Sequence, residues 1–173
     1  MLDRLLSIAV RLAGDVAECG VYKGGTAYLF AELLRGSGKH LCLFDTFDGM
    51  PETNPREDVH KKGDFGDTSL ADVKSYLAAF EKVEYFPGLI PTTLAAASGR
   101  TFCFVHVDLD IYDAILSASE FFYPRVPSGG YIVYDDYGAG DCPGARKAVD
   151  EFYADKPEVP LVLHTGQCII LKL

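Results

Sequence analysis

Apolar runs alternate with helical patterns along nearly the whole chain, and this alternation most constrains the fold. Strand-like runs are expected at residues 15–19, 40–44, 83–86, 102–107 and 130–134. Helices are expected at 26–34, 69–80, 113–122 and 144–153, with a weaker one at 92–97. The run 102–107 is apolar on both faces, which is typical of a central parallel strand. The alternation predicts an α/β sandwich in which helices cover both faces of a mostly parallel sheet.

The end of the chain departs from this pattern. Residues 159–164 and 167–173 are both strand-like, and Thr165-Gly166 between them is a two-residue hairpin signal. We therefore expect seven strands, of which the last two form an antiparallel hairpin. The length of 173 residues is that of one domain, spanning 1–173.

Charge and cysteine content exclude several classes of partner. The chain has 25 acidic and 16 basic residues, a net charge of −9, which argues against nucleic acid and anionic membranes as partners. No apolar run approaches the roughly 20 residues of a membrane helix, and the first residues are too interrupted by charge for a signal peptide. The five cysteines lack CxxC pairing, which favours a reducing, cytoplasmic location.

Residues 48–67 have prolines, glycines and charges but no periodicity. A connection of this length in a compact domain is often a lid or binding loop. We expect a lid here, because the segment leaves the sheet edge where ligands bind in such folds. The alternative is a disordered insertion.

The segment from Glu18 to Thr26 (ECGVYKGGT) follows the first strand and opens the first helix. Its glycines allow sharp turns and close approach of a ligand, and amides at a helix N-terminus can donate to an anionic group. The spacing matches neither GxGxxG nor a phosphate loop. An acidic residue before the glycines suits a ligand with a cationic or amino-acid-like part, whereas a structural tight turn explains the segment equally well.

Asp45 ends the second strand, where an acidic residue can bind both ribose hydroxyls of a nucleoside. Alone, Asp45 could equally be a capping or loop residue. Together with the glycine segment it indicates a cofactor of the adenosine type.

Carboxylates follow two further strands. Asp108 comes after the fourth strand, and Asp135 and Asp136 after the fifth. Neighbouring strand ends would bring the three together, and a hard divalent cation such as magnesium or calcium would relieve their repulsion. Solvated surface aspartates are the alternative. His106 is either a base or, more simply, a buried histidine hydrogen-bonded in the sheet. His60 in the 48–67 segment could face a substrate, although a solvated loop histidine is the simpler expectation.

These segments together resemble the TylF-like family of macrocin and mycinamicin O-methyltransferases. The matching stretches are ECGVYKGGTA, LFDTFDGMPE, GDFGDTSLADV, FVHVDLDIYDA and GGYIVYDDYGAGDCPGARKAVDEF. The resemblance implies a Rossmann-like class I methyltransferase fold that uses S-adenosylmethionine (SAM). It also implies magnesium-dependent transfer of a methyl group to a hydroxyl of a small molecule, often a sugar of a glycosylated natural product.

The resemblance also implies roles for individual residues. The cofactor would be held by Glu18, Gly20, Tyr22, Gly24, Gly25, Thr26, Asp45, Phe47 and Asp108. The metal would be held by Asp108, Asp135 and Asp136. Asp110 of the same motif would replace or assist Asp108 in that set. Asp108, or a neighbour such as His106, would take the proton of the acceptor.

The sequence differs from the family at its start, since only about 14 residues precede the first strand where family members carry a longer region that helps to close the site and build a homo-oligomer. Either the chain is a fragment or a natural short form, or the lid role falls wholly to residues 48–67. Two other readings stay open. One is a SAM-binding domain without catalysis, and the other is a metal-dependent glycosyltransferase that uses the D-x-D of Asp108 and Asp110.

Overall fold

The apolar runs form one seven-stranded sheet in the computed structural model, which describes residues 1–173. The strand order is β3-β2-β1-β4-β5-β7-β6. The first five strands run parallel, and β7 is antiparallel to β5 and β6. The strands are β1 (Asp15–Cys19), β2 (Leu41–Asp45), β3 (Val83–Pro87), β4 (Phe102–Val107), β5 (Tyr131–Tyr134), β6 (Leu161–Val162) and β7 (Cys168–Leu171). The predicted fold class is thereby confirmed.

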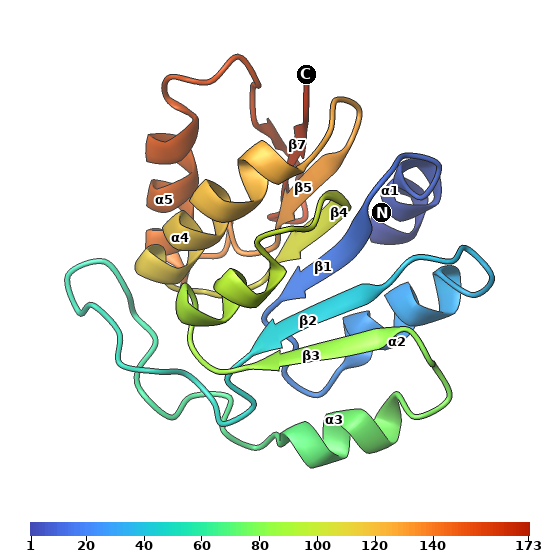
Figure 1. Cartoon of the computed structure of the whole chain (residues 1–173). Helices are drawn as coiled ribbons and strands as arrows, with labels where there is room; N and C mark the ends of the chain where they lie inside the picture. The colour runs from blue at the N-terminus through green and yellow to red at the C-terminus, as the bar shows by residue number, and fades with distance from the viewer.

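Helices cover both faces of the sheet (Figure 1). One face carries α1 (Leu2–Ala9), α2 (Gly25–Leu33) and α3 (Leu70–Tyr76). The other carries the 3-10 helix η1 (Thr92–Ala97), α4 (Tyr112–Phe122), the short 3-10 turn η2 (Tyr123–Arg125) and α5 (Pro143–Tyr153). A separate apolar core lies on each face, and all six residues of β4 are buried between the two. None of the helices combines the length and the apolar character needed to cross a bilayer.

Four details differ from the sequence-based expectation. Helix α1 was not predicted, although Leu6 and Ala9 bury one side of it. Helix α3 ends at Tyr76, four residues earlier than expected. Strand β6 has only two residues, both exposed, because it lies at the sheet edge. The hairpin turn has three residues, since the Leu163 amide donates to the Gln167 carbonyl at 2.8 Å and Gly166 adopts a positive φ of 101°.

The 48–67 segment is an ordered loop beyond the carboxyl end of β2. Its two ends meet at Gly49 and Gly66, where a Cβ on Gly49 would lie 2.7 Å from the Gly66 Cα atom. The Met50 amide donates to the Asp64 carbonyl at 2.7 Å, which closes this neck. The far part of the loop reaches the other layer, because Asp58 Oδ1 accepts from the Tyr112 amide at the start of α4 (2.9 Å).

The buried carboxylate of Glu158 binds side chains near the C-terminus, and its contribution to stability can be measured. Glu158 Oε1 pairs with Lys172 Nζ at 2.7 Å, and Glu158 Oε2 accepts from the Tyr123 hydroxyl at 2.8 Å. Burial raises the pKa of Glu158, but these hydrogen bonds outweigh it and lower the pKa from 4.5 to about 2.

We expect Glu158→Gln to lower the free energy of unfolding by about 3 kcal/mol at neutral pH. Because the folded-state pKa is lowered, this stabilisation is complete above the unfolded pKa of 4.5 and disappears as the pH falls toward 2. Urea unfolding of both proteins at several pH values checks this, with the exposed Glu81→Gln as the control. A stability difference that stays constant down to pH about 3 would contradict the assignment.

Candidate functional site

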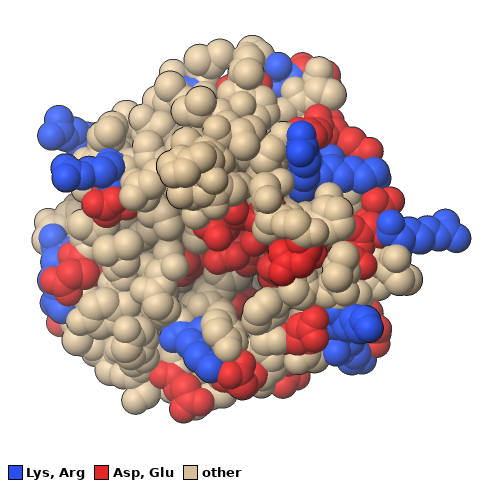
Figure 2. Space-filling model, turned by 180° about the vertical axis from the view of Figure 1, so that it is seen from behind, with Lys and Arg blue, Asp and Glu red and all other residues tan.

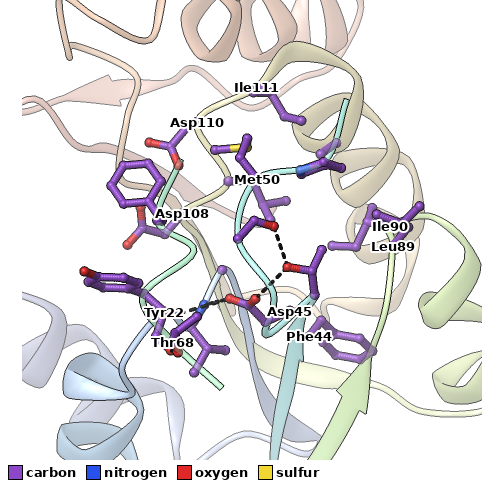
Figure 3. A pocket seen from close by; sticks show the side chains of 18 of the residues that line it. Tyr22, Phe44, Asp45, Met50, Thr68, Leu89, Ile90, Asp108, Asp110 and Ile111 are labelled. Carbon is purple, nitrogen blue, oxygen red and sulfur yellow. Dashed lines mark hydrogen bonds between the residues drawn. The ribbon is translucent and has the colours of Figure 1, made fainter. Parts of the chain in front are cut away.

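A cavity of about 570 Å³ opens at the carboxyl edge of the sheet, between the ends of β1, β2 and β4 and beneath the 48–67 loop (Figure 3). At this point β1 lies between β2 and β4, and the connections that follow β1 and β4 leave to opposite faces of the sheet. Ligands usually bind at this position in such sheets. Carboxylates make up much of its polar wall. In the space-filling view, acidic side chains gather around a hollow (Figure 2).

The glycine segment after β1 passes close to the end of β4. Gly20 has a φ of +84°, and a Cβ there would lie 1.6 Å from the Asp108 carbonyl oxygen. Gly24 has a φ of +83° and is the N-cap of α2. Glycine adopts a positive φ at no steric cost. At Gly20 this lets the turn after β1 pass close to the turn after β4, and at Gly24 it begins helix α2.

Asp45 at the end of β2 holds that segment in place. Its Oδ2 atom accepts from the amides of Val21 (2.5 Å) and Tyr22 (3.0 Å), and Oδ1 accepts from the Phe47 amide at 2.7 Å. The side chain lies on the cavity floor beneath the loop (Figure 3). Asp45 is therefore both a structural acceptor and a carboxylate available to a ligand.

A buried chain of hydrogen bonds runs behind the cavity across β1, β4 and β5. His106 Nδ1 lies 3.3 Å from Glu18 Oε1, and His106 Nε2 lies 3.4 Å from Asp135 Oδ1. Burial alone lowers the pKa of His106, but the hydrogen bonds to Asp135 and Glu18 raise it to about 10. Both ring nitrogens of His106 thus face a carboxylate oxygen, and the ring links Glu18 of β1 to Asp135 after β5.

Glu18 has one oxygen without a partner. Its side chain is 1% exposed, it lines the cavity, and Oε2 makes no hydrogen bond. Burial raises the pKa of this carboxyl. Burying a hydrogen-bond acceptor without a donor costs folding free energy. The free oxygen of Glu18 therefore indicates that a ligand in the cavity supplies a hydrogen-bond donor or a cation.

Asp108, Asp135 and Asp136 come together as expected from their strand ends. Each offers an oxygen within 4.8 Å of the other two. Burial and the neighbouring carboxylates raise the pKa of Asp108 and Asp136, whereas the hydrogen bond from His106 lowers that of Asp135. Gln167 at the start of β7 donates to Asp135 Oδ1 at 3.1 Å. An all-oxygen donor set of this charge fits a hard divalent cation.

Asp110 and His60 face one another beside this group. Asp110 has a φ of +61° and lines the cavity, and its amide donates to Asp136 Oδ2 at 3.0 Å. His60 is not the solvated residue that was expected: its side chain is only 16% exposed, and Nε2 lies 3.9 Å from Asp110 Oδ1. The loop folds back onto the sheet edge and carries the ring there.

The structure thus sorts the predicted residues into three groups. Those on the cavity wall are Glu18, Gly20, Tyr22, Gly25, Thr26, Asp45 and Asp108. His106, Asp135 and Asp136 lie behind it. Gly24 and Phe47 are not on the wall: Gly24 faces Val73 and Tyr76 of α3, and Phe47, with a φ of +54°, is 5% exposed and packs near Tyr85.

Sequence reasoning missed other residues of the wall. These are Met50 and Thr68 at the two ends of the loop, and Leu89 and Ile90 after β3. Ligands in such sheets bind beyond the carboxyl ends of the strands, and this principle pointed to Asp45 and Asp108. Applied to β3 as well, it would have identified Leu89 and Ile90. The Thr68 hydroxyl donates to the Tyr22 carbonyl, which ties this end of the loop to the glycine segment.

Comparison with known proteins places this arrangement in a family. The model of the macrocin O-methyltransferase (TylF) family matches residues 6–163. The chain belongs to the TylF family. Among TylF-like relatives, it is 29% identical over 167 residues to demethyldecarbamoylnovobiocin O-methyltransferase of Streptomyces niveus, which covers 85% of the chain and 61% of that protein. It is 28% identical over 155 residues to mycinamicin III 3''-O-methyltransferase of Micromonospora griseorubida, covering 80% and 60%.

Solved structures agree on the fold. The O-methyltransferase NovP superposes with a TM-score of 0.89 at 24% identity, over 99% of this chain and 77% of that one. An O-methyltransferase from Bacillus cereus in complex with SAH gives a TM-score of 0.66 at 18% identity, over 99% and 79%. At these identities the likeness establishes the TylF chain's class I methyltransferase fold alone. The chain spans about 60% of the length of the curated TylF-like relatives it matches.

Proposed function

We propose that this chain is a SAM-dependent, divalent-metal-dependent O-methyltransferase, folded as a single domain over 1–173, that methylates a hydroxyl of a small molecule. The observation that carries the proposal is the buried, unpartnered Glu18 Oε2 facing a cavity that Asp45, at the end of the neighbouring strand β2, also lines. Two carboxylates on one cavity suit a ligand that carries both a cationic amine and vicinal hydroxyls. SAM is such a ligand.

The cavity residues fit SAM part by part. Glu18 would pair with the amine of the methionine portion and so satisfy its free oxygen. Asp45 accepts three amides, which leaves one of its roughly four lone-pair positions, on Oδ1, for a ribose hydroxyl. The Thr46 hydroxyl lies 3.4 Å from that oxygen but donates to the Gly49 carbonyl at 2.6 Å. Phe47 and Gly24 shape the loops rather than touching the cofactor.

The carboxylate group fits a divalent cation. Asp108, Asp135 and Asp136 would hold Mg²⁺ or a similar ion, which would offset the repulsion that raises the pKa of Asp108 and Asp136. His106 acts as a positioning residue here, because its two hydrogen bonds fix Glu18 and Asp135 relative to one another.

The reaction needs a methyl donor, a polarised hydroxyl and a proton acceptor. SAM would supply the methyl group, and a cation held by the three aspartates would lower the pKa of the acceptor hydroxyl. Asp110 would take the proton, since it lines the cavity, whereas Asp108 would be held by the cation and both ring nitrogens of His106 face carboxylates. Burial raises the pKa of Asp110, which makes it a better base than a solvated aspartate. The cavity walls hold donor and acceptor in line, which supplies much of the rate.

The acceptor is proposed to be a sugar hydroxyl of a glycosylated natural product. Two relatives are named for such hydroxyls: the mycinamicin III 3''-O-methyltransferase, and a 4'-O-methyltransferase of a rhamnosyl tetracenomycin from Streptomyces olivaceus that is 26% identical over 159 residues. Residues 48–67 would act as the lid over this acceptor, because they roof the cavity and connect to α4 and α5 through Asp58 and Glu57. A homo-oligomer is proposed from the family resemblance alone.

Calorimetric titration with SAM tests the cofactor assignment. We expect Asp45→Ala to weaken SAM binding at least tenfold, because it removes the ribose acceptor and frees the Val21 and Tyr22 amides. Asp48→Ala, an exposed aspartate on the same loop, is the matched control and should bind like the parent. Equal affinity in all three proteins would overturn the assignment.

An activity assay distinguishes the proposed methyltransferase from the two alternative functions. Methyl transfer from SAM to members of a glycoside panel, in the presence of Mg²⁺, would support the methyltransferase. SAM binding without transfer to any member would favour a binding domain that has no catalytic role. Binding of a nucleotide sugar in place of SAM would favour the D-x-D glycosyltransferase.

A further inference from the structure

Three side chains with different donor atoms converge next to the aspartate group, from segments far apart in the sequence. His60 comes from the 48–67 loop, Asp110 from the turn after β4, and Cys142 from the N-cap of α5. The His60 nitrogen, the Asp110 oxygen and the Cys142 sulfur all lie within 4.8 Å of one another. None of them belongs to the set Asp108, Asp135 and Asp136.

The separations approach those of a tetrahedral metal site. Zinc–sulfur and zinc–nitrogen bonds of about 2.3 and 2.0 Å place neighbouring ligand atoms roughly 3.3–3.8 Å apart. Cys142 Sγ lies 3.5 Å from Asp110 Oδ1, and His60 Nε2 lies 3.9 Å from the same oxygen. An ion would need only a small inward movement of the His60 ring, which a loop carries.

His60 is oriented as metal-binding histidines usually are. Its Nδ1 lies 3.2 Å from Asp64 Oδ2, an oxygen that also accepts from the Lys61 amide at 3.0 Å. Metal-ligating histidines commonly donate their second ring N–H to a carboxylate, which fixes the ring and its tautomer. With Nδ1 donating to Asp64, the lone pair of Nε2 is left facing Asp110 and Cys142.

The donor set selects a different ion from the aspartate group. Thiolate and imidazole ligands favour Zn²⁺ and its neighbours over Mg²⁺, which prefers oxygen alone. All five cysteines border the apolar cores, but only Cys142, which is 3% exposed, also lies beside a histidine and an aspartate that could share a metal ion. Binding would release the thiol proton to solvent as the sulfur–metal bond forms.

We propose that His60, Asp110 and Cys142 form a second metal site, specific for a thiophilic divalent cation such as Zn²⁺, whose occupation ties the 48–67 loop to the carboxyl edge of the sheet. Because it links the loop, the β4 turn and α5, the bound ion would hold the loop closed. A further consequence rests on the proposed function: the ion would occupy Asp110 and so inhibit methyl transfer.

Titration of the metal-free protein with Co²⁺ tests the site without any activity assay. A thiolate-to-cobalt charge-transfer band is expected at one equivalent, with d–d bands of tetrahedral intensity. Cys142→Ser should abolish the charge-transfer band, and His60→Gln should weaken binding at least tenfold. The control is Cys103→Ser, whose sulfur lies beside Lys39 at the amino end of β4, and it should keep the band.

Two additions identify the site further. Excess Mg²⁺ should leave the band in place, whereas Zn²⁺ should remove it by displacement. Trypsin cleavage after the exposed Arg56, Lys61 and Lys62 should slow on addition of Zn²⁺ in the parent protein but not in His60→Gln.

Each of three outcomes would overturn the proposal. The first is no charge-transfer band in the parent, and the second is a band that survives in Cys142→Ser. The third is cobalt affinity unchanged by His60→Gln, a substitution on a loop that does not contribute to either core. Loss of SAM binding would overturn the proposed function and leave these metal measurements unaffected.

Discussion

Replacing Gly20 by alanine is expected to lower the free energy of unfolding by about 3–5 kcal/mol and to abolish SAM binding. The added Cβ would lie 1.6 Å from the Asp108 carbonyl oxygen, which is backbone and cannot rotate away. The φ of +84° adds a further cost of about 1–2 kcal/mol for any residue other than glycine. Relief of the clash requires the turns after β1 and β4 to separate, which moves Glu18 and Asp108 apart.

Gly99→Ala is the matched control for this change. Gly99 lies before β4 and outside the cavity wall, its φ is not positive, and no atom lies within 4 Å of a Cβ built there. Urea unfolding monitored by circular dichroism, together with SAM titration, compares the two. The interpretation fails if Gly20→Ala loses less stability than about 1 kcal/mol or retains the SAM affinity of the parent.

Asp110→Asn is expected to lower kcat by about 10²–10⁴-fold while leaving SAM affinity within a factor of two. The amide keeps the volume and the backbone turn but cannot take the acceptor proton. The measurement is single-turnover methyl transfer to whichever glycoside the panel identifies, beside a SAM titration of the same protein.

The control for this change is Glu120→Gln, which removes a carboxylate from the exposed side of α4 and should leave kcat unchanged. A kcat for Asp110→Asn within threefold of the parent would exclude Asp110 as the base. The same assay on Asp108→Asn would then show whether the proton acceptor is the neighbouring aspartate.

The sequence predicted what depends on local pattern. Apolar runs such as 102–107 became buried strands, and the parallel arrangement then brought Asp108 to Asp135 and Asp136. The prediction did not extend to positions decided by long-range packing. Phe47 follows Asp45 closely in sequence, but its positive φ turns the ring into the core beneath Tyr85.

His60 and Cys142 show the same limit at the site. Nothing within a few residues of either one indicates that a loop after β2 and the start of α5 lie together. Their proximity depends on how the 48–67 segment folds back, through contacts such as Asp58 with the Tyr112 amide. Helix α1 was missed for a related reason, since its amphipathic pattern covers only eight residues.

The glycine neck of the 48–67 loop has a consequence for how such a protein can diversify. Because Gly49 and Gly66 touch, the chain departs from the sheet and returns to it at almost one point. Residues can therefore be added to or removed from the segment between them without altering the spacing of β2 and α3. On the proposed function, the loop could change with the acceptor while the strand ends that would hold the methyl donor keep their positions.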